Sequence, residues 1–540
     1  MLKEPTKGRH ACHVRVRFLR VGQNHETRHP EQNFASYHST ALHTGYILRD
    51  MIPMCLAKHV GRFGRVRSAA STGLAAVAAF VFVLTCILIT TPALSQTTPS
   101  SSSSSSYDVI VVGAGMAGVT AARRLKDLGV DNVLVLEARD RVGGRTFSVD
   151  TPAGNVDLGA MWIHEAEGGN PLFDMAKNRS EPLSRLQNYN SGTIYQTSGE
   201  KLPTREWIRS YAAMGNFRRS IQDYQKANAE DPSVPDLSIW DMYRFATQDF
   251  PQETMPIANL QLHANYQVLL NGNVTDLSVL RYGDAKTLPA LDVFLVNGFD
   301  TLVKLQTPGL DIRLNSSVVE IDQSFQTSDD LVKVTLEDGT IYTAKYVLAT
   351  EPLGCLKAGN IEYIPALPVA KREAIDEMGF GVFDKAVLVY DRAYWDETDF
   401  IMQEMETMSG EWKVFLNYDE VMAKPMLVAL NVADTAKNVE RQSDETLEAE
   451  LMAALRVMYP TIPDPVEFYQ TRWYEDPWSR GAYSYFAVGN EKNITSVIGE
   501  TFGRVLFAGE AASGKPGTVL GAYLSGLDRA DEVFDKLSVV

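Results

Sequence analysis

The sequence predicts an α/β fold with two interleaved domains, and three features support this. At 540 residues the chain is too long for one compact core, which favours two domains. A β-branched apolar run at 107–112 is followed by helical spacing over 116–128 and a second apolar run at 132–136. Residues 166–290 have long polar helical stretches, after which strand-like patterns return. A parallel sheet interrupted by a second domain fits this order.

The connection between the first strand and the helix is rich in glycine. Gly113, Gly115 and Gly118 stand in G-x-G-x-x-G spacing. The first glycine permits the tight turn, the second lets the backbone approach a pyrophosphate, and the third lets the helix pack on the strand. Glu137 ends the second strand, where a carboxylate can accept both ribose hydroxyls of a dinucleotide. This context predicts a Rossmann-like nucleotide-binding unit rather than an ordinary glycine turn.

The elements that follow are predicted from local patterns. Residues 332–335 and 341–343 flank Glu-Asp-Gly at 337–339 and predict a hairpin, and 346–350 predicts another buried strand. Further on, 380–390 predicts a strand, 444–458 a helix, and 503–510 a strand that ends in a carboxylate before the last helix.

Residues 1–95 are predicted to lie outside the fold. A basic stretch at 58–67 precedes an apolar run at 74–89, and small residues follow near Ser95, as in a secretory signal. The run of 16 residues is shorter than the roughly 20 that a spanning helix needs. Export with cleavage near Ser95 is therefore expected, with an uncleaved membrane anchor as the alternative. Met51 or Met54 could be the true start.

Cysteine and sequon positions agree with export. Three of the four cysteines lie within residues 1–95, so the fold is expected to have no internal disulfide, and Cys355 to be a small apolar residue. Residues 96–106 form a Ser-rich linker. Glycosylation sequons stand at Asn178, Asn273, Asn315 and Asn493.

Charge separates the N-terminal part from the rest. Residues 1–95 carry 12 Lys and Arg and 4 acidic residues, which leaves 39 basic and 63 acidic residues, a balance of −24. This balance argues against a nucleic-acid surface and favours cationic substrates, although solubility alone would explain it. Beyond residue 95 only His164 and His263 remain among nine histidines, so no metal site is expected.

Several later segments occur in a characteristic order. A basic loop, RVGGR, occupies 141–145, and GAMWIH follows at 159–164. Lys385 stands at the head of an apolar strand, and a Trp-Tyr-rich segment runs over 473–484. Together with the glycine motif, these segments resemble the FAD-binding amine oxidases, specifically the polyamine and spermine oxidase type, over residues 107–535.

The resemblance implies a non-covalent FAD site, because Ala482 stands where a cysteinyl-flavin member has its cysteine. The expected cofactor-binding residues are Gly113, Ala114, Gly115, Met116, Ala117, Gly118, Glu137, Arg145, Gly159, Met161, Trp162, Ile163, His164, Val318, Trp473, Glu510, Thr518 and Val519. The expected catalytic residues are His164, Lys385, Trp473, Tyr483 and Thr518.

Four of the five expected catalytic residues have an ordinary alternative. His164 could be a satisfied core histidine, and Lys385 a lysine whose stem follows a strand edge to water. Trp473 and Tyr483 could be core aromatics. Two positions depart from the family: Glu165 replaces a common glycine, and Thr518 replaces a tyrosine, as in the spermine-oxidase arrangement.

The resemblance implies an FAD domain from 107–165, 291–370 and 481–540, and an α+β substrate domain from 166–290 and 371–480. The implied reaction is oxidation of a polyamine C–N bond to an imine, with electrons passing to FAD and then to O2, giving H2O2. Water then splits the imine into aldehyde and amine. The expected partners are O2 and a polyamine, which is spermine, spermidine or an acetylated form. No nucleic-acid partner is expected. A membrane is an expected partner only if 74–89 remains as an anchor.

Two other functions stay open. An L-amino-acid oxidase would share the FAD motifs but needs a cation for the substrate carboxylate. A flavin-bound interaction protein without turnover would share them too.

Overall fold

A computed structural model describes residues 106–166, 169–189, 191–228, 233–283, 292–327, 329–408 and 410–538. The predicted signal or anchor segment, the candidate start methionines and linker residues 96–105 lie outside the described residues.

The first sheet contains the predicted β–α–β unit. Strand order is β12-β9-β10-β11-β1-β2-β8, with β20 also paired to β11. β1 runs parallel to β11 and β2, and β2 runs parallel to β8, whereas β10 is antiparallel to both neighbours. The strands are β1 Ser106–Val112, β2 Val133–Leu136, β8 Asp311–Arg313, β9 Val318–Asp322, β10 Val332–Leu336, β11 Ile341–Ala349, β12 Glu362–Ile364 and β20 Val505–Phe507.

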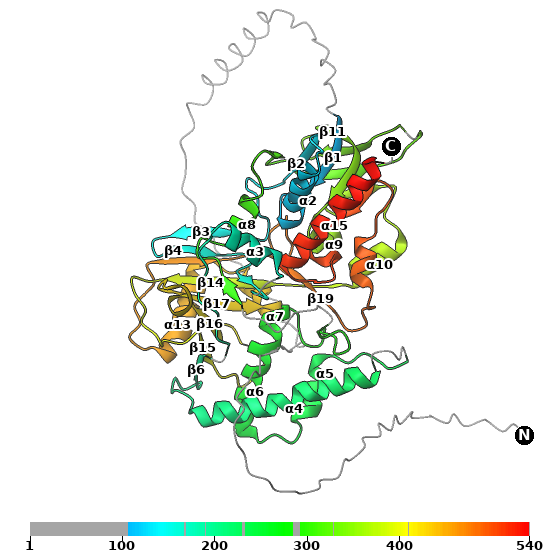
Figure 1. Cartoon of the computed structure of the whole chain (residues 1–540). Helices are drawn as coiled ribbons and strands as arrows, with labels where there is room; N and C mark the ends of the chain where they lie inside the picture. The colour runs from blue at the N-terminus through cyan, green and yellow to red at the C-terminus, as the bar shows by residue number, and fades with distance from the viewer. Residues whose placement is uncertain are drawn as a thin grey trace, which may run out of the picture. The chain divides into compact units, whose positions relative to one another are not determined.

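Two helices cover one face of this sheet. α2 (Met116–Asp127) follows β1, and α15 (Val519–Ser538) comes from the C-terminus; the two lie side by side in Figure 1. A Cβ added at Gly526 of α15 would lie 2.4 Å from the carbonyl oxygen of Ala117 in α2. Only a glycine permits this approach. The nucleotide-binding unit is therefore completed by the last helix of the chain.

One predicted pair of strands is a single strand. The stretches 341–343 and 346–350 were expected as two strands, but β11 runs without a break over Ile341–Ala349. Between them Ala344 is buried and Lys345 is exposed and paired with Asp108 at 2.7 Å. The alternation of inward and outward side chains therefore continues through this point, and one strand results.

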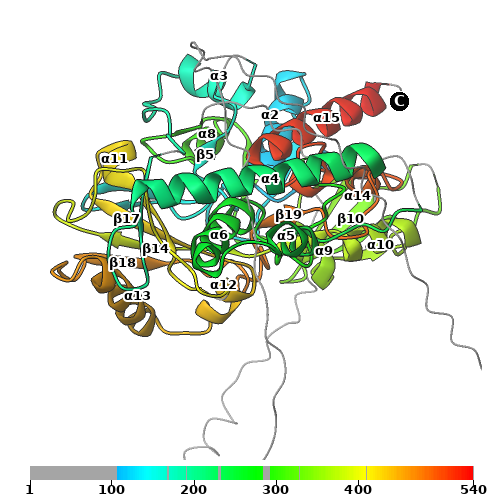
Figure 2. The same cartoon turned by 90° about the horizontal axis from the view of Figure 1, so that it is seen from below.

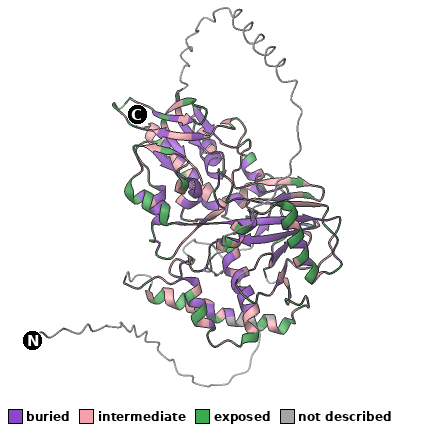
Figure 3. Ribbon diagram, turned by 180° about the vertical axis from the view of Figure 1, so that it is seen from behind, coloured by how far each residue is buried: buried purple, intermediate pink, exposed green. Residues whose placement is uncertain are grey.

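The second sheet is mostly antiparallel, with the order β18-β14-β17-β16-β15-β6 and only β15 and β6 parallel among its pairs. Apolar side chains of α13 (Asp444–Met458), which has the predicted bounds, pack on one face. Figure 3 shows both sheets as mainly buried strands. The strands are β6 Gly192–Tyr195, β14 Phe383–Val389, β15 Phe400–Gln403, β16 Val414–Asn417, β17 Met426–Val432 and β18 Glu467–Gln470.

The predicted strand 380–390 is divided in two. β13 (Gly379–Gly381) pairs with β19 (Tyr483–Tyr485), whereas β14 belongs to the second sheet. At the division, a Cβ on Gly381 would lie 1.9 Å from the carbonyl oxygen of Asn271, so the backbone changes partner where another chain segment presses against it. The change brings β19 close to the head of β14.

A helical layer lies beyond the second sheet, where Figure 2 shows α4 running across the view next to α5 and α6. Ser238 and Asp241 form a capping box at the start of α5. The helices are α4 Thr204–Asn228, α5 Ile239–Thr247, α6 Met255–Leu262, a π-helical turn His263–Gln267 and α7 Val268–Leu270. In the described part of the chain, no helix has the length and apolar character of a membrane span.

Short elements connect these layers. They are β3 Ser148–Thr151, β4 Gly154–Asp157, β5 Trp162–Ile163, α3 Pro171–Asn178, η1 Gln252–Thr254, β7 Val293–Phe294, α8 Thr301–Lys304, α9 Leu353–Ala358, α10 Val369–Glu377, α11 Tyr418–Met422, α12 Ala433–Val439, α14 Ile494–Gly499 and η3 Glu510–Ala512. The first sheet draws its strands from 106–136, 311–364 and 505–507, and the second from 192–195 and 383–470. The exact domain limits stay a prediction.

Candidate active site

The glycine motif forms a tight turn with one open side. Gly113 has φ +100°, and its N–H donates to the carbonyl of Leu136 at 2.7 Å. A Cβ at Gly118 would lie 2.0 Å from the carbonyl oxygen of Gly113. At Gly115, by contrast, a Cβ would come within 4 Å of one atom only, the carbonyl oxygen of Gly143 at 3.9 Å. The turn thus packs closely inside and leaves Gly115 accessible, as a diphosphate requires.

Glu137 lies at the end of β2, as predicted. Its Oε2 accepts from the N–H of Ala114 at 2.6 Å, and its Oε1 accepts from the N–H of Arg139 at 2.9 Å. Burial raises the pKa of this carboxyl group. Each oxygen keeps a lone pair that can accept a ribose hydroxyl, so the residues present fit a dinucleotide.

Arg145 and Glu510 lie together beside this loop. An Nη1 of Arg145 donates to Glu510 Oε1 at 2.9 Å and to the carbonyl of Ala482 at 2.7 Å. The other oxygen of Glu510 accepts from the N–H of Gly517 at 2.8 Å and from Ser484. Arg145 and Glu510, both expected cofactor-binding residues, therefore bind each other. Their contacts also join the basic loop 141–145 to segment 482–484 and to segment 510–517.

Two other expected cofactor-binding residues have clear packing roles. Val318 is buried as the first residue of β9. Gly159 permits a crossing, because a Cβ there would lie 2.1 Å from the carbonyl oxygen of Arg145. Segment 157–164 is held against the basic loop as a result.

Lys385 and Trp473 both hold the start of this segment. The Lys385 ammonium donates to the carbonyls of Asp157 (2.8 Å) and Gly159. Trp473 Nε1 donates to the carbonyl of Leu158 at 3.3 Å. Lys385 is only 3% exposed, so it does not reach water along a strand edge. Burial lowers its pKa to about 7, partly offset by Asp157, whose own pKa burial raises to about 6.

Buried carboxyl groups position the Trp473 loop. Asp384 Oδ1 accepts from the N–H of Trp473 at 3.3 Å and from the Thr471 hydroxyl at 2.6 Å. Glu440 accepts from the N–H groups of Tyr474 and Glu475 at 2.8 and 2.7 Å. Burial, together with the nearby carboxylate of Glu440, raises the pKa of Asp384 far above its usual range. Asp384 and Glu440 both lie outside the segment 473–484, from which the role of Trp473 is predicted.

His164 lies at the other end of the segment. Its Nδ1 is 3.0 Å from Oδ2 of Asp292, and the Tyr189 hydroxyl donates to the same oxygen at 2.6 Å. Burial alone would lower the pKa of His164, but the charge of Asp292 and its hydrogen bond outweigh burial and raise it. The Trp162 indole stacks on the imidazole, with centroids 6.3 Å apart. The side chain is 36% exposed, so His164 is not a core histidine.

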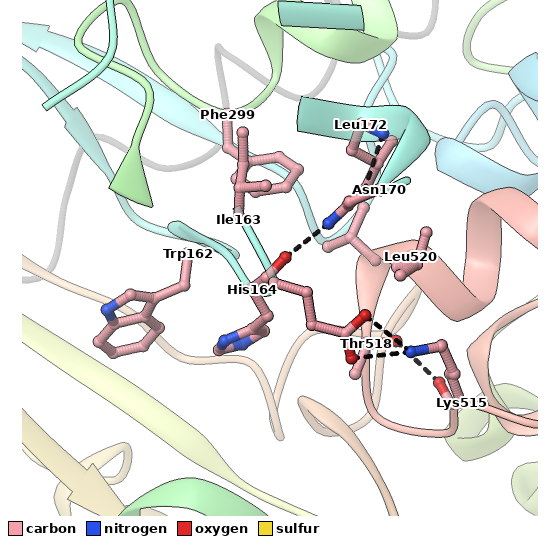
Figure 4. Close-up of a pocket in the computed structure, with 11 residues that line it drawn as sticks. Trp162, Ile163, His164, Asn170, Leu172, Phe299, Lys515, Thr518 and Leu520 are labelled. Carbon is pink, nitrogen blue, oxygen red and sulfur yellow. Dashed lines mark hydrogen bonds and ion pairs between the residues drawn. The ribbon is translucent and has the colours of Figure 1, made fainter. Parts of the chain in front are cut away.

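A small pocket lies beside His164. Figure 4 shows the Trp162 and His164 rings directed away from Phe299. Thr518 and Lys515 lie to the right of His164 in this view. The Thr518 hydroxyl donates to the carbonyl of Lys515 at 2.8 Å and accepts from the N–H of Gly521 at 2.9 Å, which caps α15. Val519 begins that helix and also lines the pocket.

Tyr483 lies near the same helix end. Its hydroxyl donates to the carbonyl of Leu269 at 2.9 Å, and a Cβ on Gly517 would lie 3.2 Å from its ring. Of the five expected catalytic residues, Lys385 and Trp473 thus bind segment 157–159, His164 and Thr518 line one pocket, and Tyr483 lies against Gly517, next to Thr518. Asp292, Tyr189 and Lys515 were missed, because no sequence motif includes them.

The described residues contain no group of three or more His, Cys, Asp or Glu side chains able to hold a metal ion. Cys355 is buried, and burial raises the pKa of its thiol to about 12, as expected of a packing residue.

Comparison with known proteins identifies the family. Residues 116–534 match the model of the flavin containing amine oxidoreductases. The chain belongs to this family. Its cofactor is FAD, and its reaction is the oxidation of an amine. The glycine turn, Glu137 and the Arg145–Glu510 pair are the residues that would hold the cofactor.

Relatives of this amine oxidoreductase have more than one described activity. Polyamine oxidase 2 of Arabidopsis thaliana is 30% identical over 441 residues, which is 79% of this chain and 88% of the relative. Lysine-specific histone demethylase 1 homolog 2 of Oryza sativa subsp. japonica is 30% identical over 451 residues, 81% of this chain and 58% of the relative. A redesigned putrescine oxidase has the same fold, with a TM-score of 0.65 and 20% identity over 80% of this chain and 99% of that one.

Proposed function

We propose that this amine oxidoreductase oxidises polyamines, converting a C–N bond to an imine that water splits into an aldehyde and an amine, while O2 becomes H2O2. The observation that carries the proposal is the wall of the pocket, which contains the Glu165 carboxylate, the Trp162 ring and His164, whose Nδ1 contacts Asp292. Carboxylates and aromatic faces attract cationic amines. Similarity to plant polyamine oxidases over 88% of their length supports the same class.

The residues of the chain have distinct tasks in this scheme. FAD, when bound, supplies the oxidising chemistry. His164 faces the substrate nitrogen and, in its neutral form, can accept the proton that this nitrogen must lose. Trp473 and Lys385 fix segment 157–159, and Trp162 and Tyr483 exclude water from the site.

An amine panel with a peroxide readout tests the proposal. Spermine, spermidine, acetylated spermine, benzylamine, leucine and a histone H3 tail peptide are supplied to the purified holoenzyme. Spermine or spermidine should turn over fastest. Leucine alone would identify an L-amino-acid oxidase, and the peptide alone a demethylase. Absence of flavin bleaching by every amine, without O2, would indicate an interaction protein.

We also propose that the mature protein is exported. The basic stretch at 58–67, the apolar run at 74–89 and the small residues near Ser95 support this. Among the sequons, Asn178, Asn315 and Asn493 are exposed, while the Asn273 amide donates to Asp434 at 3.0 Å.

N-terminal sequencing of native protein should begin near residue 96, and a glycosidase should lower the mass. Recovery of peptides from 74–89 would favour the membrane anchor.

A further inference from the structure

The pocket beside His164 contains an ion pair without a role in the scheme above. The Lys515 ammonium lies 2.8 and 3.0 Å from the two carboxylate oxygens of Glu165, and both residues line the pocket. Figure 4 shows these contacts as dashed lines at Lys515, on the pocket side that also holds Thr518. The Glu165 side chain is 9% exposed and that of Lys515 is 23% exposed. The pair thus presents a buried carboxylate behind a more accessible ammonium.

The backbone does not explain why a glutamate stands at this position. Glu165 has φ +56°, in the left-handed region where side chains other than those of Gly, Asn and Asp are strained. A glycine would remove this strain together with the burial of a charge. The carboxylate is therefore held against the local conformational preference, which is typical of a functional position.

The other polar side chains of the pocket are already occupied by the backbone. The Asn170 amide donates to the carbonyl of His164 at 2.5 Å and accepts from the N–H of Leu172 at 2.9 Å. The Thr518 hydroxyl caps α15. Recognition of a charged ligand in this pocket therefore falls to His164, Glu165 and Lys515.

We propose that Glu165 is the subsite for a primary ammonium group of the substrate, and that the Lys515 ammonium occupies it until substrate arrives. The Lys515 side chain is itself an alkylammonium group bound to Glu165. The end of a polyamine fits the same position, because it has the same head group on a similar methylene chain. Exchange keeps the buried carboxylate paired, which avoids the large cost of leaving it alone. The displaced ammonium is the more exposed partner and can return to water.

Only the lysine side chain needs to move. The backbone of Lys515 is held on both sides, since its N–H donates to the Ser513 hydroxyl at 3.1 Å and its carbonyl accepts from Thr518. The inference rests on the proposed function and predicts a preference for polyamines with at least one unacetylated primary amine.

The test compares spermine with N1,N12-diacetylspermine, which keeps the chain and the secondary amines but lacks primary ammonium groups. In Glu165→Gln holoenzyme, KM for spermine should rise about 10-fold or more, equivalent to about 1.4 kcal/mol. We expect kcat to stay within about 3-fold when it is measured at a pH where His164 is neutral, because Glu165 then influences turnover only through substrate binding. KM for the diacetylated compound should stay within about 2-fold.

Lys515→Met separates recognition from structure. It removes the internal competitor, so KM for spermine should fall or stay unchanged. A rise equal to that of Glu165→Gln would make the pair structural and overturn the proposal. Glu165→Gly should reproduce the KM effect of Glu165→Gln while relieving backbone strain, with bound-flavin absorbance as the check of folding.

Glu362→Gln, on exposed β12, is the matched control for loss of one negative charge and should leave both KM values unchanged. Equal KM changes for both compounds in Glu165→Gln would refute the subsite. If the unmodified enzyme oxidises neither compound, the proposed function fails instead, so the two failures are distinguishable.

Discussion

Asp292 Oδ2 lies 3.0 Å from Nδ1 of His164, and this contact leaves Nε2 as the nitrogen available to the pocket. The carboxylate raises the pKa of His164 although burial opposes it. Glu165 acts in the same direction and Lys515 in the opposite one, so three charged neighbours set the protonation of this histidine. Asp292 is accordingly a positioning residue, since it acts through the imidazole.

Asp292→Asn should move the acidic limb of the kcat/KM profile to lower pH. Activity on a cationic amine should rise as His164 loses its proton, and removal of the carboxylate lowers the pKa of His164. A displacement of about one pH unit corresponds to about 1.4 kcal/mol. The measurement is peroxide formation from pH 5 to 10. An unshifted acidic limb would show that Asp292 does not influence the titration of His164.

The same variant should be least stable, relative to the unmodified protein, in acid. A pKa raised in the folded state adds stability that is fully present below the unfolded value of about 6.5 and is lost as pH rises through the folded value. Thermal unfolding at pH 5.5 and pH 8.5 should therefore show the larger difference at pH 5.5. An equal difference at both values would mean that Asp292 stabilises the fold independently of the charge on His164.

Lys385→Met should slow turnover about 10-fold or more, equivalent to about 1.4 kcal/mol. The cation is expected to help electrons reach O2, and it is present below its pKa of about 7. The reaction of reduced enzyme with O2 should slow as pH rises through 7, and the variant should lack this dependence in stopped-flow mixing.

Lys424 provides the matched control. It is also buried and donates to backbone carbonyls, but to those of Asn155 and Val296 and not to those of Asp157 and Gly159. Lys424→Met should keep the oxygen reaction within about 3-fold of the original. Equal losses in both variants would reduce Lys385 to a structural lysine.

Thr518→Tyr should favour smaller amines, because it narrows the pocket between His164 and α15. It also removes the cap on Gly521, which costs about 1 kcal/mol of stability. Thr518→Val loses the cap without adding bulk, so it should share the stability loss but keep the substrate order. The ratio of benzylamine to spermine turnover is the measurement; the same ratio in both variants would contradict the steric account.

FAD should be released by acid precipitation, giving a yellow supernatant and a colourless pellet. Ala482 lies beside Tyr483 and cannot form a thioether, and Cys355 is buried with its pKa raised to about 12. Absorbance near 450 nm in each fraction is the measurement. Colour that remains with the pellet would demonstrate a covalent link.

Local patterns were sufficient for much of the fold. β1, α2 and β2 have nearly the predicted bounds, and α13 has them fully, because apolar spacing and caps are encoded within each segment. β11 was divided incorrectly, since a lysine within it resembles a break when its ion pair with Asp108 is unknown.

Contacts over long sequence distances were not predictable in this way. His164 and Asp292 are 128 positions apart, and Glu165 and Lys515 are 350 apart. Lys385 was noticed as a charge in an apolar strand, but nothing near it in sequence indicates that Asp157 and Gly159 receive its hydrogen bonds. Motifs located the region, and only the folded chain identifies the partners.

The approach of Gly526 to Ala117 has a consequence for biosynthesis. The apolar face of α2 is translated early, but its covering helix α15 follows only after the 391 residues from 128 to 518. At about 5–20 residues per second, this face waits roughly 20–80 s for its partner. The nascent chain must therefore be protected from aggregation during synthesis, and cofactor loading must follow release from the ribosome.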